Sequence, residues 1–584
     1  MTIIFQIDYA AQWGDELVVR SSLQQEPLAM RCLDGRRWEA ALEVGAWPAA
    51  LYYKYALRKA DGELVYEAEA WRRLALEGTP YPAVALADSW RVAGERALIA
   101  APYTSVLFRQ KAKGEGKLNQ HACKLTVAAS CIPQGCVLCA TGSAEALGRW
   151  DRQRPLLMQP NGEGGWHTGF TPAASQQPIC YKYALYDLEQ RRIVGYEQRA
   201  DNRTLPAAGG AKAALWRDDG APRFDLPLPR GAGVAIPVFA LRSESGYGVG
   251  QFTDLKLLAD WAKLAGLSMI QLLPVNDTSA TATWADSYPY AGISVFALHP
   301  LYLDLAPLAA CLTARQAEQL RREQAELNAL REVDYEQAMR LKWKYARIAY
   351  AKEKSAVFAS KEYQAFFAQR QEWLAPYAAF CYLRDQHGTA DFAAWGDYAT
   401  YSAAKVAALA APRAAAHDEL ALHYYVQFLL HRQLQEATAY CRARGIVLKG
   451  DIPIGIARRS CDAWVAPHLY NMDAQAGAPP DAFSATGQNW GFPTYSWERM
   501  AADGYRWWQQ RLRAMAEYFD AFRIDHVLGF FRIWEIPLGA VEGLLGCFSP
   551  ALPLSVAELG QRGAWFDAER LCAPYLTPQV LRDA

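Results

Sequence analysis

A short sequence pattern in the first two hundred residues occurs twice at a constant spacing. The stretch YKYAL at 53–57 recurs at 181–185, and Trp38 recurs at Trp166, so both landmarks are displaced by 128 residues. A displacement shared by separate landmarks indicates a duplicated domain. This part of the chain is therefore expected to form two similar folds.

Short segments of alternating polar and apolar residues surround these landmarks, with Gly, Pro and Asp between them. Such alternation is typical of strands that bury one face, and the segments include IIFQIDY, ELVVRSS, KLTVAAS and CVLCATG. We therefore expect two N-terminal antiparallel β-sandwich modules, at residues 1–110 and 118–206. Residues 207–231 are rich in Pro, Gly and Ala, and we expect them to form a linker.

The pattern changes in residues 232–584, where short apolar strands alternate with amphipathic helices. A long charged and Ala-rich stretch at about 305–440 is expected to be a helical insertion. The β-helix-β order indicates a TIM-type (β/α) barrel, whose reactive groups lie at the carboxyl ends of strands. We count four strands where a (β/α)8 barrel closes with eight, and so expect its first half: 234–239, 267–275, 446–454 and 521–527.

The stretch FRIDHVLGFFRIW at 522–534 carries the strongest chemical signal. Strand alternation sends Arg523 and Asp525 to the same face. A cation beside a carboxylate favours the ionised form and lowers its pKa, and an ionised Asp suits nucleophilic attack on a sugar carbon. An isolated R-x-D is more often an ordinary ion pair. Whether this one is catalytic therefore depends on the neighbouring motifs. Asp451 also follows a buried strand, which places a second carboxylate at the same end of the expected barrel.

Composition excludes several function classes. Lys plus Arg and Asp plus Glu both number 61, which gives no electrostatic reason to expect nucleic acid or an anionic membrane as partner. No stretch reaches the ~18 uncharged apolar residues of a membrane span. The N-terminal MTIIFQIDYAAQWGDE has no basic leader, so a cytoplasmic protein is expected.

Metal and nucleotide cofactors are not expected either. Cys131, Cys136 and Cys139 form the tightest cysteine group, but a zinc site needs a fourth ligand, so reduced thiols are the better interpretation. The stretch GYGVG at 246–250 lacks the third Gly of a dinucleotide loop.

Five blocks of sequence together resemble the 4-α-glucanotransferases (amylomaltases, or disproportionating enzymes) of glycoside hydrolase family 77. The blocks are QLLPVNDT, DSYPYAGISVFALHPLYLDL, KGDIPIGIARRSCDAWVAPHLYNMD, GAPPDAFSATGQNWGFPTYSWERM and FRIDHVLGFFRIW. The resemblance covers about 232–584. With the tandem N-terminal modules, the whole chain resembles the cytosolic disproportionating enzymes of maltose metabolism. It implies retaining transfer of α-1,4-glucosyl units from maltose or maltodextrin to a glucan acceptor such as glycogen or a heteroglycan, without metal or cofactor.

The resemblance also implies a role for each residue of the motifs. Asp525 would be the nucleophile that forms a glucosyl-enzyme, and Arg523 would hold it anionic. Asp451 and His526 would hydrogen-bond sugar hydroxyls, and Tyr290 would stack on the sugar ring. The loop over the acceptor side would contain two further residues, Gln488 and Trp490.

A retaining enzyme of this kind needs a second carboxylate about 5–5.5 Å from the nucleophile as acid–base catalyst. The family carries it on a later strand in an A/G-E-D-L-G context, and a third Asp follows in an H-D pair. The carboxylates after Trp534 stand in neither context: Glu535, Glu542, Glu558, Asp567, Glu569 and Asp583. We therefore expect the chain to stop part-way through the catalytic domain. The alternative is a non-catalytic α-glucan-binding fragment, or one half of a split enzyme.

The second copy of the repeat resembles the starch-binding modules of carbohydrate-binding family 20. The resemblance rests on ALGRWD at 146–151, GYE at 195–197 and DNR at 201–203. It implies an aromatic platform with polar partners, made of Trp150, Tyr196, Lys182, Glu197 and Asn202. The first copy keeps only Lys54, Tyr66 and Glu67, which leaves open whether it packs or binds glucan weakly.

Overall fold

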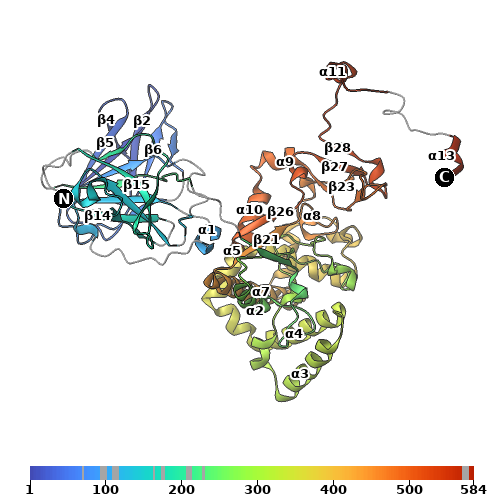
Figure 1. Ribbon diagram of the computed structural model, residues 1–584. Helices are drawn as coiled ribbons and strands as arrows, with labels where there is room; N and C mark the ends of the chain where they lie inside the picture. The colour runs from blue at the N-terminus through green and yellow to red at the C-terminus, as the bar shows by residue number, and fades with distance from the viewer. Residues whose placement is uncertain are drawn as a thin grey trace. The chain divides into compact units, whose positions relative to one another are not determined.

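The computed structural model describes residues 1–68, 71–91, 102–107, 118–129, 131–133, 135–161, 165–172, 178–205, 213–225, 231–567 and 578–583. The chain forms two compact units (Figure 1). The first comprises Met1–Val234 with Ala259–Ile270 and Tyr440–Leu448. The second comprises Ala235–Leu258, Gln271–Ala439 and Lys449–Ala584.

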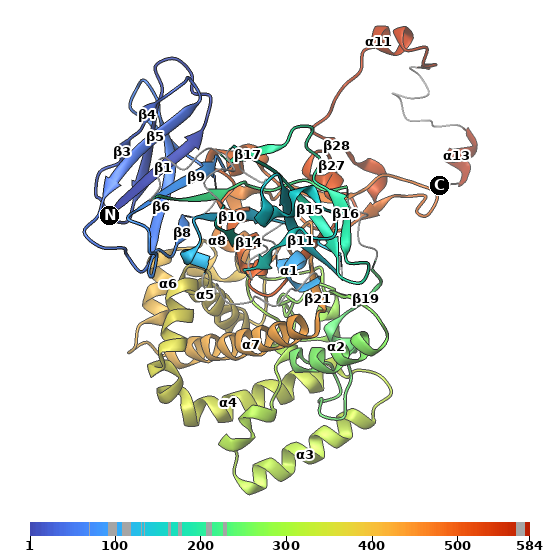
Figure 2. The ribbon, with the colours of Figure 1, turned by 60° about the vertical axis from the view of Figure 1, so that its left-hand side comes forward.

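Three sheets build the first unit (Figure 2). One has eight strands in the order β13-β14-β10-β18-β9-β1-β5-β4. The other two have five strands each: β3-β2-β6-β7 with β8 beside β6, and β12-β11-β15-β16 with β17 beside β15. The strands are β1 (Thr2–Asp8), β2 (Glu16–Ser21), β3 (Leu28–Ala29), β4 (Arg31–Cys32), β5 (Arg37–Glu43), β6 (Leu51–Arg58), β7 (Leu64–Tyr66), β8 (Arg72–Leu74), β9 (Ala83–Ser89), β10 (Cys123–Ala128), β11 (Cys136–Gly142), β12 (Leu156–Leu157), β13 (Gln159–Pro160), β14 (Gly165–Phe170), β15 (Ile179–Asp187), β16 (Arg192–Tyr196), β17 (Arg203–Leu205) and β18 (Ala213–Asp218).

Each copy of the repeat contains an equivalent buried hydrogen-bond network. In the first copy, the hydroxyls of Tyr53 and Tyr55 each donate to Asp88 at 2.9 Å. Arg72 donates to both carboxylate oxygens of Glu67, at 2.9 and 2.7 Å, and forms an ion pair with Asp88 at 3.2 Å. The same five groups recur in the second copy, as Tyr181, Tyr183, Asp219, Arg203 and Glu197. The repeated Tyr-x-Tyr is therefore structural, because buried phenols need an acceptor.

Strand β18 lies inside the segment expected to be a linker, 207–231, and corrects that expectation. It pairs in parallel with β9, from Ala213 opposite Ala83 to Asp218 opposite Asp88, and so joins the two copies in one sheet. Residues 206–212 and 226–230 of that segment lie outside the described residues. The short Ala-rich strand is stable because both of its faces are covered.

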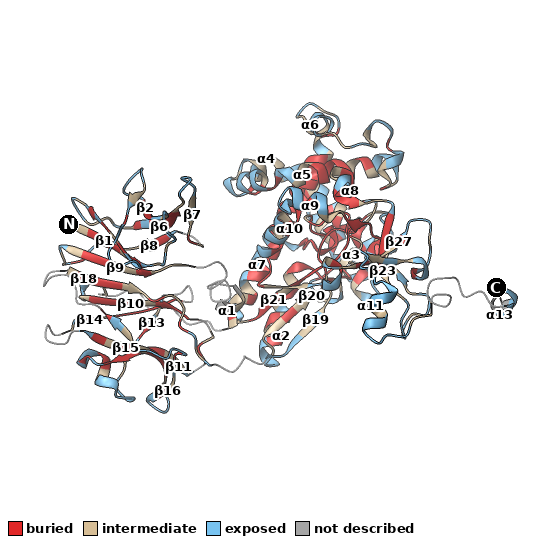
Figure 3. Cartoon of the chain, turned by 90° about the horizontal axis from the view of Figure 1, so that it is seen from above, coloured by how far each residue is buried: buried red, intermediate tan, exposed pale blue. Residues whose placement is uncertain are grey.

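Both central strands contribute to two cores (Figure 3). Leu86 of β9 packs in the core of the first copy, whereas its neighbour Ala85 packs in the core of the second. Conversely, Leu215 of β18 packs in the second core and Trp216 in the first. Alternation along a strand sends neighbours to opposite faces, so each core is completed by a strand from the other copy.

A further sheet has four strands in the order β19-β20-β21-β26. The four strands expected after residue 232 are all present but shorter: β19 (Gly233–Ile236), β20 (Met269–Leu272), β21 (Val447–Ile452) and β26 (Ala521–Ile524). The expected insertion is helical, with Thr313 and Gln316 forming a capping box before α3. The helices up to β21 are α2 (Leu255–Leu264), α3 (Ala314–Ala329), α4 (Tyr335–Ala359), α5 (Lys361–His387), α6 (Ala403–Ala410) and α7 (His417–Arg444). A single turn, α1 (Pro102–Leu107), belongs to the first unit.

Small antiparallel sheets follow β21, and sequence alternation does not reveal them because their strands are short. One sheet has the order β24-β23-β27-β28, and β22 pairs with β25. The remaining elements are α8 (Cys461–Val465), β22 (Tyr470–Asn471), β23 (Ala474–Ala478), β24 (Gln488–Asn489), β25 (Thr494–Tyr495), α9 (Trp497–Ala502), α10 (Arg506–Ala516), β27 (Ile533–Pro537), β28 (Cys547–Ser549), α11 (Val556–Gln561) and α13 (Pro578–Asp583). Among the described residues, no helix combines the length and apolar character that a membrane crossing requires.

Candidate active site

The parallel pairing of β21 with β26 brings the two predicted carboxylates together. Asp451 lies opposite Arg523 in this register, and the backbone N–H of Asp525 donates to the carbonyl of Ile452 at 3.1 Å. Both carboxylates therefore lie at the carboxyl ends of neighbouring strands, where parallel sheets carry their reactive groups.

Four side chains form one hydrogen-bond network at this edge. Tyr290 donates its hydroxyl to Oδ2 of Asp451 at 2.8 Å, and Arg523 donates Nε to Oδ1 of Asp451 at 2.8 Å. Arg523 also donates Nη2 to the Tyr290 hydroxyl at 2.8 Å and to Oδ1 of Asp525 at 3.3 Å. Asp451 is buried and bound at both oxygens, so its charge is compensated, whereas Arg523 binds one oxygen of Asp525.

Burial decides the ionisation of Asp525, and it corrects the expectation of a lowered pKa. Burial raises the pKa of Asp525 above its ordinary 3.8, although the Arg523 guanidinium acts in the opposite direction. The nearby charge of Asp451 raises the pKa further. The sequence showed the cation but not the burial, which is the larger effect.

The loop predicted to lie over the acceptor side contacts His526, the residue after Asp525. The rings of Trp490 and His526 lie 4.9 Å apart at 81°. Trp490 donates its indole N–H to Oε1 of Gln488 at 3.0 Å. Burial lowers the pKa of His526 below 6.5, which favours a neutral imidazole. The structure therefore places all three predicted residues beside Asp525 or in direct contact with one another.

Tyr288 is a site residue that the sequence did not single out. Its ring lies 5.6 Å from that of Tyr290, and it is 54% exposed. Burial and the charge of Asp525 both raise the pKa of Tyr288, which places the phenol near that carboxylate. The signal was available, because the S-Y-P-Y motif contains two tyrosines and only the second was chosen.

Two of the carboxylates after Trp534, Glu535 and Glu558, make local structural contacts. Thr494 donates its hydroxyl to Glu535 at 2.6 Å, and Glu558 accepts from Ser555 in the capping box of α11. Glu569 lies outside the described residues. No group of three His, Cys, Asp or Glu side chains that could hold a metal occurs within the described ranges. Cys136 and Cys139 are not in disulfides, and burial raises the pKa of Cys139 to about 12.

The platform predicted on the second copy is exposed at its two rings. Trp150 is 36% exposed and Tyr196 39% exposed. Trp150 ends the 3-10 segment Glu145–Trp150, and the following residues are tied to β16 because Ile193 donates its N–H to the Arg152 carbonyl at 2.8 Å.

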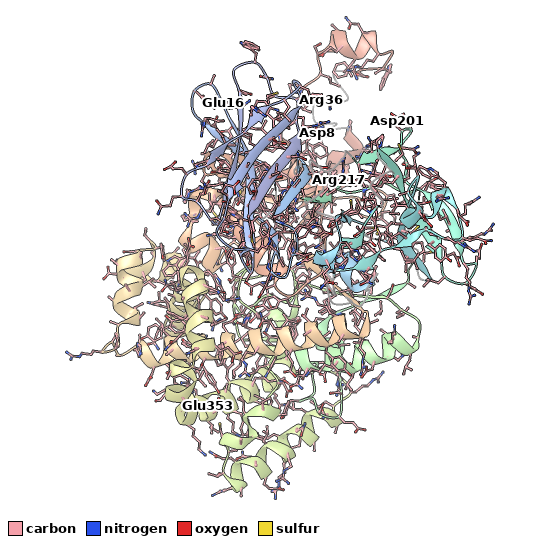
Figure 4. All side chains as sticks on the ribbon, turned by 90° about the vertical axis from the view of Figure 1, so that its left-hand side faces the viewer. Asp8, Glu16, Arg36, Asp201, Arg217 and Glu353 are labelled. Atoms are coloured by element: carbon pink, nitrogen blue, oxygen red, sulfur yellow. The ribbon has the colours of Figure 1, made fainter. Side chains whose placement is uncertain are left out.

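The polar partners of that platform divide into two kinds. Lys182 donates its ammonium to the Arg199 carbonyl at 2.7 Å, and Asn202 is exposed, one residue after Asp201, which Figure 4 labels. Glu197 is buried and bound by Arg203 at 2.8 Å. Its carboxylate belongs to the structural network and not to the surface, which corrects its predicted role.

The family model for 4-alpha-glucanotransferase (glycoside hydrolase family 77) matches residues 236–569. The chain belongs to the 4-alpha-glucanotransferase family. The relative "4-alpha-glucanotransferase DPE2" of Oryza sativa subsp. japonica is 38% identical over 609 residues, covering 100% of this chain and 64% of that protein. The 4-alpha-glucanotransferase of Chlamydia pneumoniae is 34% identical over 303 residues, or 52% of this chain and 56% of its own.

This member of the 4-alpha-glucanotransferase family thus spans less than two thirds of the length of both relatives. Among solved structures, the amylomaltase from Streptococcus agalactiae in complex with acarbose aligns with a TM-score of 0.49 and 22% identity, over 61% of this chain and 71% of that one. Family membership rests on the sequence match alone.

Proposed function

We propose that this chain carries the nucleophile and donor-side residues of a retaining 4-α-glucanotransferase. The observation that carries the proposal is the network in which Arg523 bonds both Asp451 and Asp525 at the ends of paired parallel strands. We further propose that the sheet β19-β20-β21-β26 is part of a (β/α)8 barrel, and that the protein acts in the cytoplasm.

The reaction has two displacements. A carboxylate oxygen of Asp525 attacks the anomeric carbon of an α-1,4-linked glucosyl unit, the glycosidic C–O bond breaks, and the leaving oxygen takes a proton from an acid. A glucan hydroxyl then attacks the same carbon, displaces Asp525 and gives up its proton. The acid that protonated the leaving oxygen takes back the proton of the acceptor hydroxyl. Two inversions retain the α-configuration, and the donor loses one glycosidic bond while the acceptor gains one.

Residues around Asp525 would bind and orient the sugar. Asp451 is fixed at both oxygens by Tyr290 and Arg523, so its acceptor positions face one direction and could receive hydroxyls of the transferred unit. The ring of Tyr290 supplies a flat surface for that sugar, with Tyr288 beside it. Arg523 opposes the rise in pKa that burial imposes on Asp525 and keeps more of it ionised at neutral pH.

Transfer prevails over hydrolysis when a sugar hydroxyl reaches the glucosyl-enzyme before water does. The loop containing Gln488 and Trp490 packs against His526, directly after the nucleophile in the chain. An aromatic wall there would exclude water and position the acceptor, which is the physical basis of preferring a glucan.

The exposed rings of Trp150 and Tyr196, with Lys182 and Asn202, would hold a polymeric α-glucan such as glycogen or a heteroglycan. Flat rings stack on the apolar faces of glucose units, while the amine and amide bind hydroxyls. We exclude Glu197 from this surface because it is buried against Arg203.

A second candidate function is glucan binding without turnover. It is favoured by the local roles of Glu535 and Glu558, since neither contacts Asp525 among the interactions of the described residues. Incubation with maltose, followed by measurement of released glucose and of longer glucans, distinguishes the two functions. Disproportionation that disappears in Asp525→Asn supports the transferase. Maltodextrin binding with no disproportionation supports the binding protein.

A further inference from the structure

The two copies of the repeat use the same strand register around their exposed tyrosines. Ala56 of β6 lies opposite Tyr66 of β7, as Ala184 of β15 lies opposite Tyr196 of β16. Tyr53 lies opposite Arg72 of β8, as Tyr181 lies opposite Arg203 of β17. The residue before each arginine therefore occupies the same position, and these two residues are Trp71 in the first copy and Asn202 in the second.

Trp71 is a large ring at the surface, directly before β8. It is 44% exposed, and Tyr66 is half-buried. The residues that follow them, Arg72 and Glu67, form a two-point salt bridge whose side chains are only 3% and 0% exposed. Because this pair is rigid and buried, it fixes the backbone beside both rings.

Cationic groups lie around these rings. Strands β7 and β8 pair with different parts of β6, and Lys54 lies between the two paired segments. The Lys54 ammonium is 5.9 Å from the centroid of the Tyr66 ring, and Arg20 donates to the Tyr66 hydroxyl at 3.2 Å. Flat rings bordered by hydroxyl-binding groups match a chain of glucose units, which has apolar faces and polar edges.

We propose that the first copy binds an α-glucan chain on a surface formed by Tyr66, Trp71 and Lys54. The loop that carries Trp150 in the second copy, between β11 and β12, is shortened to residues 22–27 in the first. Trp71, placed by the register of β8 on β6, would supply the second ring beside the tyrosine that recurs in both copies. This inference rests on the proposed glucan binding of the second copy.

The common sheet holds the two surfaces in one body. Arg72, next to Trp71, also donates to Asp218 of β18 at 3.1 Å, and Ser89 donates its hydroxyl to the Asp218 carbonyl at 3.0 Å. A branched polymer bound at one surface is therefore presented to the other at high effective concentration. Loss of either surface lowers retention on glycogen, and loss of both lowers it further.

The test measures migration of the intact 584-residue chain in native gels containing glycogen. The double variant Tyr66→Ala/Trp71→Ala should weaken glycogen affinity about fivefold or more, given the contribution of aromatic rings to binding. Trp71→Phe, which keeps a ring, should bind nearly as the unsubstituted chain does. Trp13→Ala, a fully exposed tryptophan of the same copy, is the matched control and should not change migration.

Thermal unfolding checks that each variant is folded. Unchanged retention in Tyr66→Ala/Trp71→Ala, together with a loss in Trp150→Ala/Tyr196→Ala, would overturn this inference and leave the proposed function intact. No loss in either pair would refute glucan binding by both copies. An equal loss in Trp13→Ala would show that the effect is not specific to the surface, and would also overturn the inference.

Discussion

Arg523 binds Asp451 more closely than it binds Asp525. Its Nε lies 2.8 Å from Asp451, whereas its Nη2 lies 3.3 Å from Asp525. The buried carboxylate thus holds the guanidinium in place, and the guanidinium in turn acts on the proposed nucleophile. Asp525 receives a positive neighbour through a single, longer bond and not through a two-point salt bridge.

Replacing Arg523 by Met should change the pH dependence as well as the rate. The guanidinium lowers the pKa of Asp525 against the effect of burial, so its removal raises that pKa. The acidic limb of kcat/KM should move to higher pH, and kcat should fall about 10²-fold, as when one electrostatic donor is lost. A pH profile on maltotriose measures both; an unmoved acidic limb would contradict this role.

In an enzyme that also contains the acid–base carboxylate, Asp525→Asn should abolish glucan transfer and preserve binding of maltodextrin. The amide keeps the shape of the side chain but cannot attack the anomeric carbon, so we expect a loss on the order of 10⁴-fold or more. Calorimetric titration with maltoheptaose reports binding, and chromatography of the glucan products reports transfer. Comparable transfer by the variant and by the unsubstituted enzyme would refute the assignment.

Trp150→Ala/Tyr196→Ala should weaken binding to glycogen. Each ring contributes roughly 0.5–1.5 kcal/mol by analogy with aromatic pairs, so the two together correspond to about a fivefold to hundredfold loss. Glu197→Gln offers a useful contrast, because this carboxylate is buried against Arg203. That substitution should lower the melting temperature. A change in glycogen affinity at unchanged stability would instead restore Glu197 to the binding surface.

His423 of α7 makes the second unit sensitive to acid. It is buried against Trp343, with ring centroids 4.9 Å apart, and burial lowers its pKa from 6.5 to about 4. Since the unfolded chain binds the proton more readily, this contribution to stability is complete above pH 6.5 and declines as pH falls toward 4. The decline is on the order of 3 kcal/mol.

His423→Phe should therefore reduce the dependence of the melting temperature on pH between 6.5 and 4, while His431, whose pKa burial lowers to about 3, maintains part of it. The phenyl ring fills the same space and cannot take up a proton. An equally steep dependence in the variant would show that another group controls the acid response.

Sequence patterns predicted the elements that have a clear alternation of polar and apolar residues or a recognisable motif. The YKYAL strands and the strands that carry Asp451 and Arg523 follow from alternation and motif, although the two strands are shorter than expected. The bond between Arg523 and Asp451 was not predicted. Strand β18 could not be predicted in this way. It is only six residues long, and its burial depends on two cores, of which the first is formed by residues more than a hundred positions earlier in the sequence.

Burial likewise explains the errors at the site residues. Glu197 follows an exposed tyrosine, so its sequence position suggested the surface, yet Arg203 holds it inside. The pKa of Asp525 depends on desolvation, which no spacing of charges in the sequence reveals. In each case the missing information was the position of a residue relative to the interior.

Trp216→Ala should destabilise the first copy of the repeat, although Trp216 follows the second copy in the sequence. This indole lies in β18 but packs in the core of the first copy, where it is 4% exposed. Truncating a buried Trp costs about 3–5 kcal/mol. The near-ultraviolet dichroism and melting of the first unit measure the loss, with exposed Trp13→Ala as the control. A change below about 0.5 kcal/mol, typical of surface sites, would contradict the shared core.

The shared core also sets the order in which the newly made chain can fold. The strands of the first copy end at Ser89, yet that copy stays unfinished until Trp216 leaves the ribosome. At about 5–20 residues per second, this interval lasts on the order of ten seconds. During that time β9 presents an unpaired edge and one uncovered face. The nascent chain is therefore most prone to aggregate before its second repeat is complete, and a chaperone would act at this stage.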